Sequence, residues 1–370
     1  MTMSDTAPEL AVRRAPRQPR QQTAYAAVSA EVQAMGLMRR RYGLYWTKMV
    51  LAVVVLAALV TTHVLLGDTW WQLLLAAALA VVLTQVSFLA HDAAHRQIFK
   101  SGAWNDWTSI ILANGLAGMS VGWWTNKHTK HHGNPNTAGK DPDIDSGVLA
   151  FTPEQGLQAK AKGGVRGWFA ARQGYAFFPL LLLEGLNLHA QGLKLVFGRR
   201  PMKRRWVEGS LIIGRLGAYV ALVFFVLSPG KAFAFLGVQL GLYGLYMGAS
   251  FAPNHKGMAI IAPGTTIDFL RRQVMTSRNI RGGRFMDFAL GGLNYQVEHH
   301  LFPSMPRPNL RRAQPVVKAY CEKNGIHYTE TGLFTSYRIV VRYLNKVGLG
   351  ARDPFDCPLV QATRPRTVVG

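Results

Sequence analysis

Two apolar stretches decide the fold class: TKMVLAVVVLAALVTTHVLL (residues 47–66) and WWQLLLAAALAVVLTQVSFLA (residues 70–90). A helix of about 20 residues is roughly 30 Å long, which matches the hydrocarbon core of a bilayer. Only residues 67–69 separate the two stretches, so we expect two antiparallel membrane-spanning helices. Trp70 and Trp71 are the kind of side chains that lie at a membrane surface.

Two further spans are expected later in the chain, at residues 210–228 and 232–252. Residues 104–122 are apolar but interrupted by glycines, and residues 174–183 are too short to cross a bilayer, so both are predicted to be interfacial helices. The sequence therefore predicts an all-α membrane protein with four transmembrane helices, interfacial helices and a cytosolic helical cap.

The charge distribution gives the orientation. The chain has 42 Lys and Arg against 19 Asp and Glu, a net charge of +23. Eight of these basic residues lie in residues 1–48 and six in residues 191–209, whereas the connections at 67–69 and 229–231 carry none and one. By the positive-inside rule both termini and the middle segment are cytoplasmic. The Ala-, Gly- and Arg-rich composition favours a bacterial plasma membrane, and the apolar segments argue against a nucleic-acid-binding protein.

The same patterns divide the chain into three parts. Residues 1–45 are predicted to be a disordered basic segment. Residues 46–253 form the membrane domain, with a cytosolic insert at 91–209. Residues 254–370 form the rest of the cytosolic cap. The 2 cysteines offer neither a disulfide framework nor a Cys-rich metal site, which suits a reducing compartment.

Histidines gather at four places beside the cytoplasmic ends of these spans. Residues i, i+3 and i+4 share a helix face, so clustered imidazoles can converge on one ion, and neutral imidazole is a good ligand for iron, copper or zinc. Eight such residues without a cysteine suggest two metal ions, and redox-active iron fits better than structural zinc. The remaining histidines, His63, His189 and His327, are expected to have no metal role. The four places hold His91 and His95; His128, His131 and His132; His255; and His299 and His300.

These motifs resemble those of the integral-membrane di-iron fatty acid desaturases. The resemblance covers about residues 45–345. It rests on HDAAH (91–95), HTKHH (128–132), QVEHH within GGLNYQVEHHLFPSMPRPNLRR (291–312), QVMTSRN (273–279) and the DPDID stretch (141–145).

The resemblance implies four transmembrane helices, a cytosolic cap holding two irons and a buried tunnel for an acyl chain. The eight clustered histidines would be the ligands. Many relatives have a histidine at the first position of the last motif. This chain has Gln296 there, as the acyl-CoA and front-end groups do. Gln296 is either a weak ligand or a residue that supports one. Other candidates for orienting the imidazoles are Asp92, Asn254, Glu298, Asp141, Asp143 and Asp145.

The implied activity is the O2-dependent introduction of a cis double bond into a long-chain acyl substrate. Acyl-CoA is the expected carrier form, with its headgroup received by Arg271, Arg272, Arg278, Arg281 and Arg284. We find neither a His-Pro-Gly-Gly haem signature nor a Gly-x-Gly-x-x-Gly site after a strand, so the expected electron donor is a separate ferredoxin or similar carrier with a flavin reductase.

Three other interpretations stay open. A hydroxylase or ketolase on the same scaffold would yield a product that has gained oxygen instead of losing two hydrogens. A membrane haem electron-transfer protein would show a Soret band and would place its ligands within the bilayer. A non-catalytic metal-binding or transport protein would place ionisable residues within the spans.

Overall fold

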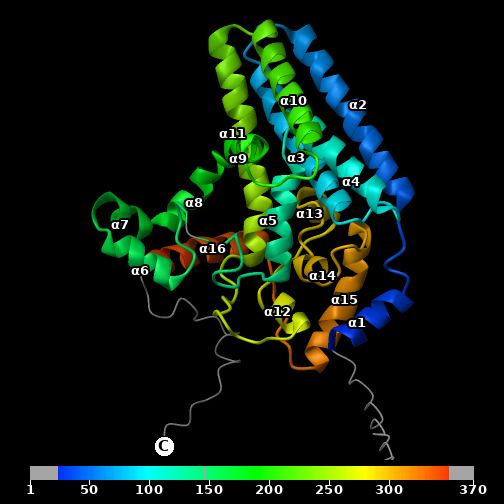
Figure 1. Ribbon diagram of the computed structural model, residues 1–370, viewed down its shortest axis with the longest axis vertical. Helices are drawn as coiled ribbons and strands as arrows, with labels where there is room; N and C mark the ends of the chain where they lie inside the picture. Colours follow the sequence, from blue (N-terminus) through cyan, green and yellow to red (C-terminus); the bar gives the residue numbers. More distant parts are fainter. Residues whose placement is uncertain (1–23, 146, 350–370) are drawn as a thin grey trace, which may run out of the picture.

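The computed structural model describes residues 24–145 and 147–349, and within them the chain forms a bundle of long helices standing on a cap of shorter ones (Figure 1). Four helices are long and apolar enough to cross a membrane. The predicted all-α membrane architecture with four spans is therefore confirmed, and the chain is an integral membrane protein. These helices are α2 (Tyr42–Leu66), α3 (Gln72–Ala94), α10 (Arg205–Val226) and α11 (Pro229–His255).

Helix α3 is the centre of the bundle and α2 lies at its edge. Helix α3 packs against α2, α4 and α11, and its buried side chains Leu83 and Leu89 join Tyr243 of α11 in one apolar core. Helix α2 buries only Tyr45 and His63, so almost its whole surface is left for lipid. Apolar residues on every side of α2 are therefore explained by the membrane and not by the protein core.

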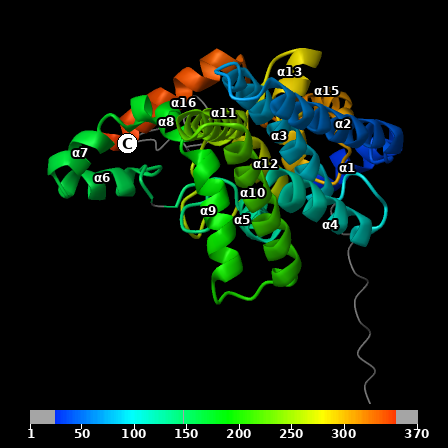
Figure 2. The ribbon, with the colours of Figure 1, turned by 90° about the horizontal axis from the view of Figure 1, so that it is seen from above.

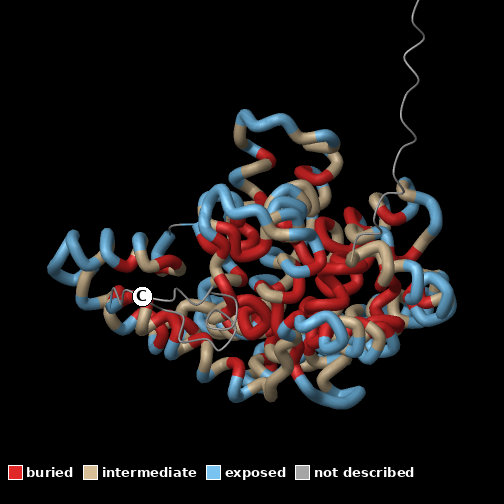
Figure 3. The backbone as a smooth tube through the Cα atoms, turned by 90° about the horizontal axis from the view of Figure 1, so that it is seen from below, coloured by how far each residue is buried: buried red, intermediate tan, exposed pale blue. Residues whose placement is uncertain are grey.

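The cap is built from the first described helix, from α5 between the second and third spans, and from segments after the last span. Its β-strands β1 (Asn279–Ile280) and β2 (Glu330–Thr331) form one short parallel pair. Figure 3, seen from below, shows that buried residues concentrate near the middle of the molecule and exposed ones around its edge. The cap helices are α1 (Ala24–Ala34), α5 (Val121–Gly133), α12 (Phe269–Met275), α13 (Arg284–Ala289), α14 (Gln296–Leu301) and α15 (Arg307–Lys323).

The remaining helices lie beside the bundle, and α6 and α7 extend to one side of the molecule (Figure 2). The predicted segment 104–122 is split into an α-helix and a π-helix, which ends at Gly118 with φ of 76°. The predicted segment 174–183 corresponds to α8, which contains Pro179. These helices are α4 (Gly102–Ile110), η1 (Ile111–Ala117), α6 (Pro153–Ala161), α7 (Gly164–Ala170), α8 (Gln173–Leu181), α9 (Glu184–Phe197) and α16 (Leu333–Gly348).

The prediction that residues 1–45 are disordered was wrong for residues 24–45. Helix α1 buries Val28 and Val32 completely in a core shared with α12, α14 and α15, and the Tyr25 hydroxyl donates to the Leu301 carbonyl at 3.1 Å. The two valines are one helical turn apart, which gives this alanine-rich segment a narrow face of larger apolar side chains. Residues 1–23 lie outside the described residues.

Candidate metal centre

All eight clustered histidines meet where the cap joins the bundle. His91 lies in the last turn of α3 and His95 is its C-cap residue, while His255 is the final residue of α11. The other five come from the cap. They are His128, His131 and His132 on α5, and His299 and His300 on α14.

The rings form two groups whose ligand atoms lie within 4.8 Å of one another. One group contains His91, His95, His128 and His299, and the other contains His131, His255 and His300. Within the first group the Nε2 atoms of His95 and His128 are 2.9 Å apart. Within the second, the Nε2 atoms of His131 and His255 are 3.3 Å apart. Two neighbouring cation sites are the arrangement that this division favours.

His132 lies between the two groups. Its ring stacks on that of His300 with centroids 4.1 Å apart and an interplanar angle of 7°. Its centroid is also 4.4 Å from that of His128 and 4.7 Å from that of His95. It can therefore serve either ion.

Ring nitrogens without partners indicate that this donor set fits metal ions. Among the described residues, both nitrogens of His132 and the Nε2 atoms of His91, His299 and His300 are buried without a hydrogen-bond partner. Leaving a buried polar atom unpaired costs on the order of 1–3 kcal/mol. A bound cation would take up one lone pair from each of these rings.

The pair His131 and His255 gives independent support. The Nδ1 of His131 lies 3.0 Å from the Asp141 carboxylate, and the Nδ1 of His255 lies 2.9 Å from the Thr276 carbonyl. Both partners can only accept, so in the neutral rings Nδ1 carries the hydrogen and Nε2 carries the lone pair. The two Nε2 atoms then point toward each other at 3.3 Å, the direction from which one cation could bind both rings.

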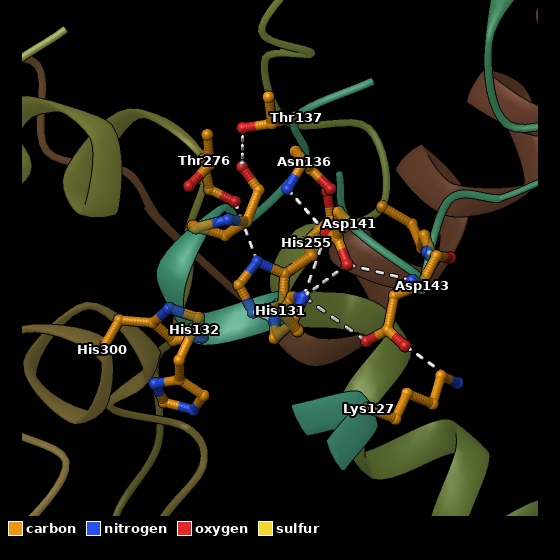
Figure 4. A network of polar contacts seen from close by, with 12 residues as sticks. Lys127, His131, His132, Asn136, Thr137, Asp141, Asp143, His255, Thr276 and His300 are labelled. Atoms are coloured by element: carbon orange, nitrogen blue, oxygen red, sulfur yellow. Dashed lines mark hydrogen bonds and ion pairs between the residues drawn. The ribbon is translucent and has the colours of Figure 1, made fainter. Parts of the chain in front are cut away.

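Acidic residues lie beside the Nδ1 atom of His131, and the Nε2 atom of the same ring faces His255 (Figure 4). Asp141 accepts from His131 as described, and Asp143 lies 3.5 Å from the same Nδ1 while pairing with Lys127 at 2.8 Å. Such partners fix the tautomer and direction of a ligand ring. Asp145, from the same stretch, is exposed.

Gln273 orients a ring in the same way, and sequence reasoning did not single it out. Its Oε1 accepts from the Nδ1 of His300 at 2.9 Å, and its Nε2 donates to the His132 carbonyl at 3.0 Å. The only sequence signal was its position in residues 273–279, one of the motifs on which the family resemblance rests.

Asp92 links the centre to α15. Its carboxylate lies 3.6 Å from the Nδ1 of His91 and 2.5 Å from the Nη2 of Arg307. It is placed to hold the His91 ring.

Gln296 and Asn254 lie inside the site, whereas Glu298 does not. The Gln296 amide nitrogen is 2.8 Å from the Nε2 of His255, and its oxygen accepts from Asn254 at 3.2 Å. Glu298 instead accepts from Asn279 at 2.7 Å and from Tyr328 at 2.6 Å. The structure thus directs Glu298 away from the imidazoles that it was expected to orient.

Burial sets the protonation of the site. It lowers the pKa of His95, His128, His132, His299 and His300 well below the usual value, so these rings are neutral at pH 7. Neutral imidazole is the form that binds a metal ion. Burial acts in the same direction on His131, but Asp143 and Asp141 outweigh it and raise the pKa of His131.

The histidines expected to have no metal role lie outside both histidine groups, although the Nε2 of His63 is also buried without a hydrogen-bond partner. His63 bonds with Gln72 at 2.7 Å, His189 donates to the Gly118 carbonyl at 2.9 Å, and His327 is exposed. One prediction about the basic surface was wrong. Arg278 is buried and donates to the Pro253 carbonyl, so it cannot receive a headgroup at the surface.

An apolar cavity of about 230 Å³ adjoins the histidines. We call it the histidine-side cavity; its lining includes His128, His131 and His255. Trp123, Lys127 and Glu184 add polar atoms to it. Its apolar walls come from Met119, Phe177, Leu181, Leu188, Met247 and Phe251.

Comparison with known proteins places this chain among relatives. The sequence pattern of the family described as fatty acid desaturase matches residues 68–332. The chain is similar to the acyl-lipid (9-3)-desaturase of Physcomitrium patens, with 28% identity over 289 residues that cover 74% of this chain and 53% of the relative. It is 31% identical to the fatty acid desaturase 2-like protein FADS2B of Mus musculus over 282 residues, 72% of this chain and 54% of that protein.

A third relative is the Delta(6)-fatty-acid desaturase fat-3 of Caenorhabditis elegans, 31% identical over 284 residues, 73% of this chain and 63% of that protein. The match therefore spans between one half and two thirds of these relatives' lengths. The family match itself extends from just before α3 to just after β2 and includes all eight histidines. The chain belongs to the fatty acid desaturase family.

Proposed function

We propose that the protein is an O2-dependent fatty acyl desaturase that uses two iron ions and introduces a cis double bond into a long-chain acyl substrate. The observation that carries the proposal is the convergence of eight histidines from four chain segments beside an apolar cavity. A site of this composition has the ligands for a redox metal and a dry space for an alkyl chain.

The overall reaction fixes what the site has to provide. One CH2–CH2 unit loses two hydrogens and becomes CH=CH, while O2 takes up four electrons and four protons and becomes two waters. Two of the electrons and two of the protons come from the substrate, and the others come from an external donor and from solvent. Bound iron would supply the O2-dependent redox chemistry.

The protein's own residues would position the metal and the chain. His91, His95, His128 and His299 would hold one ion, and His131, His255 and His300 the other, with His132 between them. Asp141 and Gln273 would keep two rings pointing inward. The apolar walls of the histidine-side cavity would hold the reacting methylenes near the ligands and exclude water.

The proposal also includes the acyl carrier, the electron donor and the membrane orientation. Arg271 and Arg281 are exposed on the cap and suit a phosphate-bearing carrier such as coenzyme A. The same basic surface suits docking of an acidic electron carrier such as a ferredoxin served by a flavin reductase. The charge bias of the loops supports a cytoplasmic active site with both termini on that side, and the composition supports a bacterial plasma membrane.

The test is to measure iron content and the cellular fatty-acid profile for the wild type and for His131→Ala and His299→Ala, with exposed His327→Ala as the matched control. We expect about two irons per chain and a new unsaturated acid in the wild type and control, and loss of both in the two ligand variants. Retained iron and product in those variants would refute the ligand assignment. An oxygenated product would indicate a hydroxylase or ketolase, and a Soret band a haem protein.

Incubating the active enzyme with acyl-CoA and with acyl-lipid substrates separately tests the carrier. Conversion of acyl-lipid alone would contradict the acyl-CoA proposal.

A further inference from the structure

A second cavity, of about 800 Å³, lies between α2, α3, α13 and α15. It shares no lining residue with the histidine-side cavity, whose lining comes mainly from α5, α8, α9 and α11. We call it the α2 groove. Figure 2 shows α2 and α13 on the same side of the molecule, away from α9.

One part of the α2 groove is apolar and faces the membrane. Leu51 and Val55 of α2 and Val81 and Val82 of α3 line it. Leu51 and Val81 are among the large exposed apolar residues, 57% and 44% accessible. Because α2 and α3 both span the membrane, this part of the groove is open to acyl chains from the bilayer.

The other part, toward the cap, is basic. Arg41, Lys48 and Arg284 line it together with Arg307 and Arg311. The acid in its lining is Asp287, which already pairs with Arg311 at 3.5 Å.

Three of these cations have no carboxylate partner. Within residues 24–145 and 147–349, no acidic oxygen lies within 4.0 Å of the charged nitrogens of Arg41, Lys48 or Arg284. The guanidinium of Arg307 pairs with Asp92, yet its Nε is buried without a hydrogen-bond partner. The mouth of the groove therefore carries an excess of positive charge and unused donors.

The position of Lys48 strengthens the case. It lies almost two turns inside α2, a span that faces lipid. An ammonium group at this depth is costly unless it reaches the surface or meets an anion. Lipid phosphates lie at that level of a membrane, so an anion is available where the charge is placed.

We propose that the α2 groove binds one anionic phospholipid, with its phosphate among Arg41, Lys48 and Arg284 and an acyl chain along Leu51, Val55 and Val81. The excess charge at one end and the apolar wall at the other match the two halves of such a lipid. A soluble anion would leave the apolar wall unused, and a neutral lipid would leave the three cations unpaired. The proposal does not depend on the desaturase activity.

The test is binding of phosphatidylglycerol to the purified, delipidated full chain in detergent, titrated and counted by native mass spectrometry. The groove variant is Lys48→Gln with Arg284→Gln, and the matched control is Arg312→Gln, an exposed arginine on α15 outside the groove. We expect about one tightly bound lipid per chain and roughly 30-fold weaker binding in the groove variant, since each basic residue near an anionic lipid contributes about 1 kcal/mol. The control should bind as the wild type does.

A second variant, Val55→Trp, fills the apolar part and leaves every charge in place. It should also lose the lipid, and unchanged thermal unfolding shows that its fold is intact. The proposal is overturned if phosphatidylcholine binds equally well, if inorganic phosphate alone competes at the same concentration, or if neither variant differs from Arg312→Gln. Displacement of the lipid by acyl substrate at stoichiometric concentration would also overturn it, because the groove would then be a substrate entrance.

Discussion

Replacing Asp141 by asparagine isolates the contribution of one buried carboxylate to the metal centre. Its two oxygens lie 3.1 and 3.0 Å from the Nδ1 of His131, and they also accept from the backbone N–H groups of Asn136 at 2.7 Å and Asp143 at 2.9 Å. An amide keeps one accepting oxygen and turns an NH2 group toward groups that donate. Some of these donors would then be left unpaired in a buried place.

Two magnitudes follow from these contacts. Removing a group that orients a metal-bound histidine typically costs 10–100-fold in metal affinity, about 1.4–2.8 kcal/mol. Leaving a buried donor unsatisfied costs about 1–3 kcal/mol of folding stability whether or not metal binds. We therefore expect Asp141→Asn to bind Fe²⁺ about 10–100-fold more weakly than the wild type and to unfold more easily.

The assay is anaerobic equilibration of each protein in buffers of defined free Fe²⁺, followed by measurement of bound iron and of thermal unfolding. Asp145→Asn is the matched control, because Asp145 belongs to the same stretch and is exposed. It should match the wild type in both measurements. If Asp141→Asn binds Fe²⁺ within about twofold of the control while losing stability, then Asp141 holds the loop and does not orient His131, and the reasoning is refuted.

Three further predictions concern other parts of the molecule. Gly291→Ala should destabilise the fold by more than about 1–2 kcal/mol in urea unfolding, because φ is +59° and the new Cβ would meet the Phe88 ring at 2.4 Å; Gly264→Ala, at φ +80° with open space, gives the backbone cost alone. Burial raises the pKa of Glu298 from 4.5 to about 7, so its contribution to the free energy of unfolding is fully present below pH 4.5 and is lost as pH rises through 7. Glu298→Gln should therefore flatten the dependence of the unfolding free energy on pH between these values. An unchanged slope in the variant would contradict this prediction. Removing iron with a chelator should lower the free energy of unfolding by about 2.7 kcal/mol relative to protein in free Fe²⁺ at 100 times the Kd. Equal melting temperatures of the two forms would argue against a metal site that exists only in the folded protein.

The four spans and the eight histidines could be predicted because both depend on local patterns. A span needs only length and apolarity, and the candidate ligands at 91 and 95, or at 128 and 132, repeat at one helical turn. The helix that continues α11 to His255 was likewise implied by the closeness of that residue to its span. None of this requires knowledge of the tertiary fold.

The neighbours of the ligands depend on tertiary contacts and were harder to predict. Gln273 and His300 come from different helices, and no local pattern says that they touch. The misplacement of Glu298 was avoidable, because at 100° per residue it lies about 160° from Gln296 on α14, whereas His299 and His300 share the face of Gln296.

Helix α1 was missed for a related reason. Its apolar residues are mostly alanines, and only Val28 and Val32 mark its buried side. A face of two valines becomes stable only against a partner surface that lies far away in the sequence, on α12, α14 and α15.

Helix α11 runs without interruption for 27 residues, about 40 Å, and carries the candidate ligand His255 as its last residue. Membrane helices change tilt when bilayer thickness changes. With its midpoint fixed, a tilt of about 3° would move that end by about 1 Å, several times the roughly 0.2 Å within which metal–ligand distances are held. The position of His255 is therefore coupled to the thickness of the surrounding membrane. That thickness changes in turn with the unsaturation of the membrane's lipids.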